Sequence, residues 1–401
     1  MSTYQLVEEP ARNAVIKVIG VGGGGGNAVA YMQTTGVEGV ELVAVNTDLQ
    51  ALRATGVRTC VQIGASLTRG LGAGSDPEIG RQAALEDRDR LEDTVRGADM
   101  VFITAGMGGG TGTGASVVLA QLARESGALV VAVVTRPFQL EGRRRLEAAD
   151  RGLELLAQHA DSLIVVPNEK LFSVLGPDCT LDEAFETANG VLVGAVRGIA
   201  DLITRPGRMN LDFADVRAVM TQNGTAVMGS GVAEGPGRAA EATRQAIESP
   251  LLENVTLKGA RGVLVNVSCG TSPTLAEVAE IGRMIGEVAA EDAVVKVGTH
   301  HDTELGGRLR VTVVATGLAG PRPPAGAIPR LAPEPEPAPA ARPKPLGVRG
   351  PSPQPPVFPE FEPLVPSAPR RRAGPPSPPV LGDDARVENP ELPAFLRRQA
   401  D

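Results

Sequence analysis

The chain has no tryptophan, two tyrosines and eight phenylalanines among its 401 residues, so any core must be built from aliphatic side chains. With 42% apolar residues it can still bury more than one core. Its three cysteines, Cys60, Cys179 and Cys269, are odd in number and lack metal-ligand spacing, and the three histidines form no ligand pattern. We expect buried, unpaired thiols in a reducing compartment, which excludes a disulfide-stabilised secreted domain.

Long apolar runs and a positive charge balance are also missing. No run approaches the roughly 20 residues that span a bilayer, and the N-terminus lacks a signal-peptide profile. The net charge of −8 argues against nucleic acid or a basic membrane-binding face. Only five of the 39 basic residues are lysines and none follows a glycine, so no Walker A motif exists. We expect a cytoplasmic protein that is not a P-loop enzyme.

Glycine, by contrast, is abundant, and a first cluster follows a buried strand at residues 14–19. This cluster, Gly20 to Asn27, leads into a helix over residues 28–34, and a second strand over residues 41–45 ends at Asn46 and Asp48. The order is that of the opening βαβ unit of a nucleotide-binding sheet. Three glycines fit G-x-G-x-x-G and Asp48 stands where a dinucleotide fold keeps its ribose-binding acid, so this segment alone leaves an NAD oxidoreductase open.

A second glycine cluster, Gly106 to Gly114, lies between an apolar strand at residues 100–103 and a helix at residues 115–124. With so little side-chain bulk, consecutive N–H groups can turn toward an anion at the start of the helix. A third cluster at residues 70–77 opens a helix over residues 77–96, and a charged loop at residues 135–145 follows a strand at residues 128–134. Because the carboxyl ends of parallel strands meet at one sheet edge, these loops should form one phosphate-binding site.

Residues 180–205 carry an apolar stripe at three- and four-residue steps and predict one helix nearly 40 Å long. Beyond it, Asp212 and Asp215 stand three apart at the start of another helix, where Asp212 could simply be an N-cap. Past residue 317 the composition changes: 24 of the 33 prolines lie beyond residue 320. We expect a disordered linker there and a short tail with a small apolar face at Leu392, Phe395 and Leu396.

The segment Gly108 to Gly114 resembles the signature loop of the tubulin and FtsZ superfamily, and its flanks resemble the bacterial FtsZ family in particular. The segment from Asn210 to Asp215 is similar to the catalytic loop of that family, and the last sixteen residues to its partner-binding tail peptide. The resemblance implies a GTPase that polymerises head to tail into the filaments of the bacterial division ring at midcell. It also implies GTP or GDP and Mg²⁺, with K⁺ as an additional ion, and tail-binding division proteins such as the actin-like membrane anchor FtsA.

The expected fold is α/β: a Rossmann-like parallel-sheet GTPase domain, a long central helix, a second α+β domain, a disordered Pro-rich C-terminal linker and a short tail peptide. The expected boundaries are 1–12 for a flexible leader, 13–179 for the GTP-binding domain and 180–205 for the central helix. They are 206–317 for the C-terminal domain with the catalytic loop, 318–385 for the linker and 386–401 for the tail peptide. The resemblance places nucleotide contacts at Gly23, Gly24, Gly25, Gly26, Asn27, Asn46, Asp48, Gly108, Gly109, Gly110, Thr111, Gly112, Thr113, Gly114, Glu141, Arg145, Phe185 and Asn189.

Within that set, Glu141 and Arg145 match ribose and phosphate contacts, Asn189 matches the guanine-reading position, and Phe185 is placed to stack on the base. The resemblance assigns catalysis to Asn210, Asp212 and Asp215, with Mg²⁺ held mainly by nucleotide phosphates and water rather than by protein ligands. Two alternatives stay open: a Rossmann-type NAD oxidoreductase, and a nucleotide-dependent scaffold that does not hydrolyse. Gly190, directly after Asn189, departs from the acidic or amide residue found there in many members of the family.

Overall fold

The computed structural model describes residues 14–171, 175–176, 179–205, 207–222, 225–249 and 259–318. The predicted leader, linker and tail therefore lie outside the described residues. The strands are β1 (Ile16–Val21), β2 (Glu41–Asn46), β3 (Thr59–Gln62), β4 (Met100–Gly106), β5 (Leu129–Arg136), β6 (Ser162–Pro167), β7 (Thr225–Ala233), β8 (Gly262–Cys269), β9 (Val294–His301) and β10 (Leu309–Leu318).

The helices are α1 (Gly22–Thr34), α2 (Leu49–Ala54), α3 (Ala65–Thr68), α4 (Pro77–Glu86), α5 (Arg88–Val95), α6 (Gly110–Glu125), α7 (Arg143–Leu156), α9 (Leu181–Thr204), α10 (Phe213–Met220), α11 (Arg238–Ile247) and α12 (Leu275–Val288), with 3-10 turns η1 (Gln139–Glu141), η2 (Asn168–Leu171) and η4 (Thr303–Leu305). None of these described helices has the length and apolar character needed to cross a bilayer.

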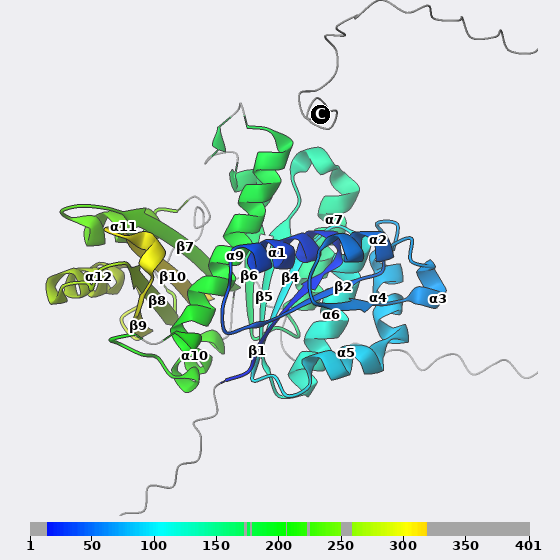
Figure 1. Cartoon of the computed structure of the whole chain (residues 1–401), viewed down its shortest axis with the longest axis horizontal. Coiled ribbons are helices and arrows are strands. Elements are labelled where there is room, and N and C mark those ends of the chain that lie inside the picture. Colours follow the sequence, from blue (N-terminus) through cyan, green and yellow to red (C-terminus); the bar gives the residue numbers. More distant parts are fainter. Residues whose placement is uncertain are drawn as a thin grey trace, which may run out of the picture. The chain divides into compact units, whose positions relative to one another are not determined.

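One ten-stranded sheet, in the order β3-β2-β1-β4-β5-β6-β7-β10-β8-β9, runs through the described part of the chain (Figure 1). Every pairing from β3 to β7 is parallel, β10 is antiparallel to both of its neighbours, and β8 and β9 pair in parallel. The predicted α/β class with a largely parallel sheet is confirmed. Parallel neighbours need crossovers, which explains the alternation of strand and helix through the first 167 residues.

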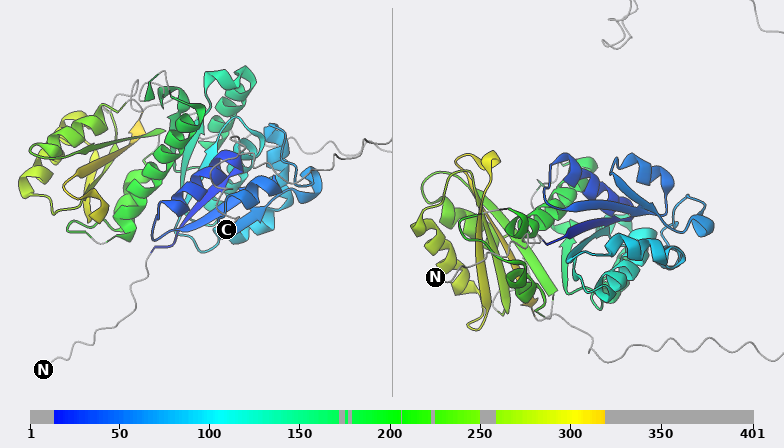
Figure 2. Two further views of the ribbon diagram at one scale, coloured as in Figure 1. Left: turned by 45° about the horizontal axis from the view of Figure 1, so that its top comes forward. Right: turned by 60° about the horizontal axis from the view of Figure 1, so that its bottom comes forward.

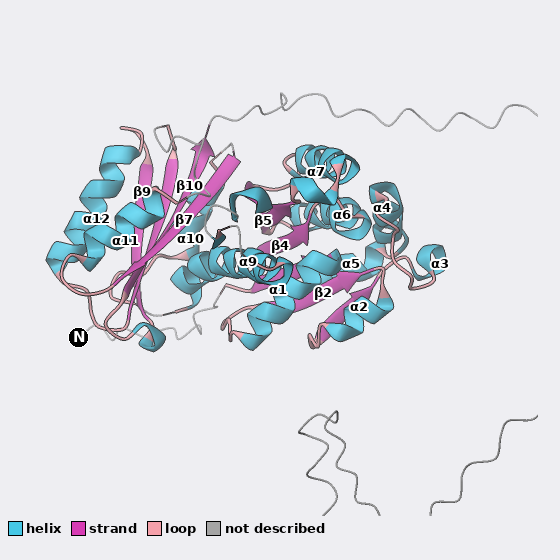
Figure 3. Ribbon diagram, turned by 90° about the horizontal axis from the view of Figure 1, so that it is seen from above, coloured by secondary structure: helices cyan, strands magenta, loops and turns pink. Residues whose placement is uncertain are grey.

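Strand β4 shows how both faces of this sheet are buried. Met100 and Phe102 contribute to one apolar cluster with α1, α9 and α10, whereas Val101 and Ile103 point into a second cluster beneath α4 to α7. Successive side chains of a strand alternate between faces, so a continuous apolar run fits only a sheet covered on both sides. Seen from above, helices line both sides of these strands (Figure 3). A third cluster packs α11 and α12 on β7, β8 and β10.

Several predicted boundaries were wrong. Helix α1 begins at Gly22 rather than residue 28, and α6 begins at Gly110 rather than residue 115, so most of the glycines stand inside helical first turns. The helix expected over residues 77–96 is interrupted at Asp87, which leaves the helical region at φ −105° and ψ 30°. The short strand β3 and the Gly- and Ser-containing β7 were not predicted. Cys60, expected to be buried, is exposed, and Cys179 is half-buried.

The predicted long helix is present as α9, and it spans the sheet from one edge to the other. Thr180 and Glu183 form a capping box at its start, where each side chain accepts a hydrogen bond from the other residue's backbone N–H. Its 24 residues correspond to about 36 Å. In Figure 2 the helix, drawn in green, lies between the N-terminal strands and the C-terminal group of strands.

A buried polar cluster joins the far half of α9 to β8, β9 and β10. His300 and Asp201 are 2% and 4% exposed in their side chains, with Nε2 of His300 3.4 Å from Oδ2 of Asp201. His300 Nδ1 lies 3.0 Å from Oδ1 of Asn266, whose amide donates to the Gly198 carbonyl of α9. Arg205 faces Asp201 at 3.1 Å as an ion pair.

Burial sets the charge states in this cluster. It lowers the pKa of His300 to about 4, with the nearby Arg205 acting in the same direction, and raises the pKa of Asp201 to about 6 against the effect of Arg205 and Arg197. Arg310 and Asp302 also face the pair. At neutral pH the cluster therefore holds a neutral imidazole and an ionised carboxylate.

We expect His300→Gln to flatten part of the pH dependence of stability. The lowered pKa means that the neutral ring stabilises the fold above the ordinary imidazole pKa of about 6.5 and that this contribution is lost as pH falls toward 4. From pH 7 to about 5.5, just above the pI of 5.2, the native protein should lose about 1 kcal/mol of unfolding free energy that the variant keeps.

Asp201 has the opposite sign: its raised pKa gives a contribution present below about pH 4 and lost as pH rises through 6. It is present in both proteins, so it largely cancels in the comparison. Urea unfolding at the two pH values measures the difference. Parallel pH profiles would show that His300 already titrates with an ordinary pKa in the folded chain.

Candidate functional site

Two helices start side by side at the carboxyl edge of the sheet. Helices α1 and α6 follow directly on the neighbouring parallel strands β1 and β4. Neither N-cap, Val21 or Gly109, gives a side-chain cap, and neither first turn holds an acidic residue. Helices α9, α10 and α12, in contrast, are capped by Thr180, Asp212 and Thr274. The uncapped N–H groups and the positive ends of two helix dipoles favour an anion at this edge.

The glycines of this edge fall into two groups. Most of them let backbones touch: a methyl group on Gly25 would overlap the Thr104 carbonyl, one on Gly112 would lie 2.6 Å from the Gly106 oxygen, and one on Gly114 would overlap the Pro77 oxygen. Such contacts hold α1 and α6 against β4 and hold α6 against α4. Gly20, Gly22, Gly24, Gly26, Gly108 and Gly110 are similarly crowded, each with another atom within 3.2 Å of the added carbon.

Gly23 and Gly109 differ from all of these, because nothing lies within 4 Å of the position their β-carbon would take. Gly23 is exposed in the first turn of α1, and Gly109 is the N-cap of α6. The sheet packing therefore does not need glycine at either position. An open space beside bare N–H groups fits a phosphate that approaches the backbone closely, and in this respect the chain's residues fit a nucleotide.

The predicted threonines are tied into the framework. The hydroxyl of Thr111 lies 2.6 Å from that of Thr47 after β2, in a buried pair, and Thr113 accepts a hydrogen bond from Gly108 N–H at 2.8 Å. They thus fix the loop's shape. Asn46, at the end of β2, accepts from Asp48 N–H, and Asp48 caps α2 by accepting from Ala51 N–H. Asn27, in the second turn of α1, is exposed.

The remaining predicted nucleotide contacts lie on α7, α9 and the turn after β5. Arg145 donates to Glu141 at 2.7 Å, and Glu141 also accepts from Phe138 N–H. The Arg145 carbonyl lies where a side chain on Gly108 would stand, which brings α7 against the glycine loop. Phe185 packs edge-on against Phe138 with centroids 5.8 Å apart, yet stays 41% exposed.

Asn189 stands one helical turn after Phe185 on α9, so the two residues share a face. Its side-chain amide makes no hydrogen bond to another described residue. An amide with free donor and acceptor beside a half-exposed ring is suited to a base that is both hydrogen-bonded and stacked. At Gly190, the position that departs from the family pattern, a β-carbon would meet open space, so packing does not explain the glycine.

The three catalytic candidates, Asn210, Asp212 and Asp215, lie together at the start of α10, away from the glycine loops. Asp212 is the N-cap of α10 and accepts from Asp215 N–H at 2.7 Å, as the simple capping interpretation anticipated. Asn210 accepts from Gly207 N–H at 2.6 Å, which closes the loop. Asp215 forms an ion pair with Lys296 of β9 at 2.7 Å, a partner that the sequence pattern did not reveal.

The carboxylate loop, residues 207–212 together with Asp215 in the helical turn that follows, lies at the amino edge of the parallel strands. The glycines lie at the opposite, carboxyl edge. On α10, Arg217 donates to the carbonyls of Asp99 and Gly127, which precede β4 and β5, and the Met220 carbonyl accepts from Ser162 at the start of β6. Strands of six to eight residues separate the two edges by about 20 Å. The structure thus assembles the predicted nucleotide-contact residues along one edge and leaves the three catalytic candidates on the other.

A model of the GTPase domain of the tubulin/FtsZ family matches residues 15–176, and a model of the FtsZ family C-terminal domain matches residues 224–319. The chain is 58% identical over 315 residues to the cell division protein FtsZ of Pseudomonas aeruginosa, covering 79% of this chain and 80% of that protein. The chain belongs to the FtsZ family. It is therefore a tubulin-like GTPase, and the NAD oxidoreductase alternative finds no support.

Two further comparisons agree with this FtsZ assignment. The cell division protein FtsZ of Pseudomonas putida is 56% identical, covering 79% of each chain. A solved FtsZ dimer from M. jannaschii superposes with a TM-score of 0.74 at 44% identity, over 77% of this chain and 89% of that one. The matched region stops near residue 319, so it includes both edges of the sheet and leaves out the proline-rich segment.

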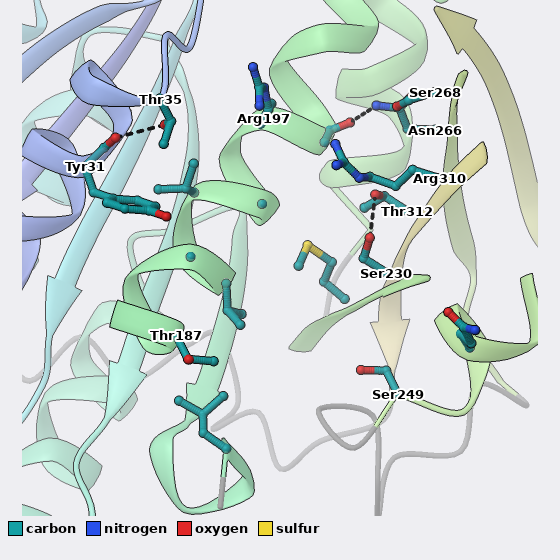
Figure 4. Close-up of a pocket in the computed structure, with 18 of the residues that line it drawn as sticks. Tyr31, Thr35, Thr187, Arg197, Ser230, Ser249, Asn266, Ser268, Arg310 and Thr312 are labelled. Atoms are coloured by element: carbon teal, nitrogen blue, oxygen red, sulfur yellow. Dashed lines mark hydrogen bonds between the residues drawn. The ribbon is translucent and has the colours of Figure 1, made fainter. Parts of the chain in front are cut away.

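A large cleft of about 1040 Å³ lies along α9, between this helix and the strands β7, β8 and β10 (Figure 4). Arg197, Thr187, Asn266 and Arg310 are among the residues that line it. The sequence analysis did not anticipate this cleft, because its lining comes from elements far apart along the chain. Within the described ranges no three His, Cys, Asp or Glu side chains lie close enough together to hold a metal ion.

The contrast between open and crowded glycines makes a matched pair of variants. Gly23→Ala adds a methyl into empty space on a helical residue, so we expect it to raise the unfolding free energy without nucleotide by about 0.5–1 kcal/mol. The same methyl should weaken nucleotide binding at least about tenfold by displacing a charge-assisted hydrogen bond. Fluorescent GDP titration and thermal unfolding measure the two effects.

Gly25→Ala is the control, because its methyl would overlap the Thr104 carbonyl and should destabilise the fold by about 1–3 kcal/mol. If Gly23→Ala binds GDP as tightly as the native chain, no phosphate lies over the first turn of α1.

Proposed function

We propose that this chain hydrolyses GTP at a site shared between two copies, in the head-to-tail filament of the bacterial division ring. The observation that supports it is a separation in space: the glycine edge carries the residues predicted to contact nucleotide, while Asp212 and Asp215 lie at the opposite edge of the same sheet. Each chain then presents one half of a site at each end. A contact that brings unlike ends together does not close on itself and propagates as a filament.

On the nucleotide side, the N–H groups at the starts of α1 and α6 would hold the phosphates, with open space at Gly23 and Gly109 for close approach. Arg145 would add positive charge near the phosphates, and Phe185 and Asn189 would receive the base. Asn can pair with a donor edge and an acceptor edge of guanine, whereas adenine presents the reversed pattern. Asn46 and Asp48 would act through water or Mg²⁺ near the terminal phosphate.

On the opposite side, Asp212 and Asp215 would meet the nucleotide of the neighbouring subunit. As carboxylates they can accept hydrogen bonds from water and orient it toward the terminal phosphate, the task of a general base in phosphoryl hydrolysis. Asn210, held by its bond to Gly207 N–H, would fix the loop that presents them. Mg²⁺ would supply charge neutralisation on the phosphates, and K⁺ is proposed as an accompanying ion.

The relatives support this proposal. The proteins matched in Pseudomonas are named cell division proteins, and the solved M. jannaschii structure is of an FtsZ dimer. Assembly at midcell and binding of partners such as FtsA through residues 386–401 are proposed from the tail sequence alone, since those residues lie outside the described part of the chain. The non-hydrolysing scaffold is disfavoured by the family's GTPase domain.

The shared site predicts that hydrolysis depends on assembly. GTP turnover should appear only above a threshold protein concentration and should rise together with light scattering recorded on the same samples. Turnover proportional to protein from the lowest concentration, without scattering, would mean that each chain holds a complete site.

Asp212→Asn tests the carboxylate without removing the helix cap, because Asn is also a strong N-cap residue. We expect turnover to fall at least about 10²-fold while the unfolding temperature stays close to the native value. Asp161→Asn is the matched control: Asp161 also accepts a backbone N–H, from Val130 at 2.8 Å at the same sheet edge, and its variant should keep turnover. Equal activity in Asp212→Asn would remove Asp212 from the mechanism.

A further inference from the structure

Strand β9 contacts the carboxylate loop and the start of α10 at two positions. Thr299 donates its N–H to the Met209 carbonyl at 2.9 Å, and its hydroxyl accepts from Met209 N–H at 3.1 Å. Three residues earlier on the same strand, Lys296 places its Nζ 2.7 Å from Oδ1 of Asp215. The backbone ladder thus anchors the loop, and the ion pair reaches the helix that follows it.

Lys296 lies on the face of β9 that meets the loop. Gly298, two residues along and therefore on the same face, has Leu202 and Leu211 against it. The Lys296 and Asp215 side chains are 36% and 32% exposed, so both are open to solvent and to an approaching molecule. Hydrogen bonding from Lys296 to Asp215, together with the charges of Asp215 and Asp212, raises the pKa of Lys296, and the ammonium stays charged at physiological pH.

Lys296 lowers the negative charge that the carboxylate loop would bring to a nucleotide. If Asp212 and Asp215 meet the nucleotide of a neighbouring chain, two carboxylates approach a triphosphate, and like charges repel across a partly desolvated interface. One ammonium bonded to Asp215 halves the negative charge of the pair. It also restricts the Asp215 carboxylate, which is 32% exposed in the first turn of α10.

We propose that Lys296 is a positioning residue for GTP hydrolysis, which fixes the Asp215 carboxylate and offsets one negative charge where the loop meets the neighbouring subunit's phosphates. This inference rests on the shared site proposed above. It assigns Lys296 two measurable effects: a correctly held carboxylate raises turnover per assembled subunit, and a smaller repulsion lowers the protein concentration at which assembly begins.

The experiment compares Lys296→Met, Lys296→Arg and Arg283→Met with the native full chain. Arg283→Met removes one positive charge from an exposed pair on α12 and controls for net charge. Because exposed ion pairs contribute little to stability, all variants should fold, and thermal unfolding checks this. GTP turnover per sedimented subunit and the assembly threshold are measured at about 50 mM and about 300 mM salt, where screening differs strongly.

We expect Lys296→Met to lower turnover per assembled subunit about tenfold, the cost of a misplaced catalytic group, and to raise the assembly threshold. The rise in the assembly threshold should be smaller at the higher salt. Lys296→Arg should restore both the turnover and the threshold to within about twofold of native. A merely structural role for Lys296 would give a deficit that neither salt nor arginine corrects, and that outcome overturns the proposal.

Turnover in Lys296→Met within twofold of the native value also overturns it. Asp212→Asn run in the same series separates the two levels of inference. If Asp212→Asn is inactive and Lys296→Met is native-like, only the role of Lys296 fails. If Asp212→Asn is active, the shared site itself fails.

Discussion

The structure depends on close packing of backbone against backbone at the carboxyl edge of the sheet. Gly25 lies on the Thr104 carbonyl and Gly114 on the Pro77 carbonyl, and Gly112 approaches the Gly106 oxygen. No side chain fits in these contacts, and α1 and α6 start at or within four residues of their strand ends without a side-chain cap on their N–H groups. The same packing that stabilises the domain therefore shapes the proposed anion site, where Gly23 and Gly109 alone among the glycines of these two helix starts face open space.

The second constraint is the rigidity of α9. It begins beside Phe138, at the carboxyl edge, and ends beside residues 38 and 39, where Arg205 pairs with Glu38 and Thr204 packs on Gly39. A capped helix of about 36 Å cannot fold back, so the loop that follows it is delivered to the amino edge. Buried polar contacts from Asp201, His300 and Asn266 then fix the C-terminal strands to this helix. Helix α9 and its contacts therefore keep the carboxylate loop and the glycine loops at opposite ends of the subunit.

Much of this architecture could be predicted from the sequence. Apolar runs such as residues 100–103 identify buried parallel strands, and the stripe of residues 180–205 identifies α9, because both patterns reflect burial of particular faces. The helix starts were misplaced because glycine has poor helix propensity, while at Gly22 and Gly110 tertiary packing decides the conformation. The exposed Cys60 follows from the short edge strand β3, which the pattern did not show.

The length of the 180–205 stripe already predicts that Asp212 and Asp215 lie at the far end of a long helix from the glycine loops, but the partners of these candidate residues needed the fold. Sequence separation gives no sign that Asp215 meets Lys296, 81 positions later, or that Thr111 bonds to Thr47. These pairs are set by the order and register of the strands. Strand β9 is the last strand of the sheet, and it pairs at Thr299 with Met209 in the loop after α9. Neither the order nor the register can be derived from local composition.

A mixing experiment tests the central claim most directly. One variant, Gly109→Ala, is impaired on the nucleotide edge, and the other, Asp212→Asn, on the carboxylate edge, so each alone should hydrolyse little GTP. In a mixture, an intact nucleotide edge from the Asp212→Asn chain can meet an intact carboxylate loop from the Gly109→Ala chain. The account predicts that turnover reappears on mixing, with a maximum near equal amounts. Two variants that are each inactive and stay inactive together, although they co-sediment, would contradict a site shared between chains.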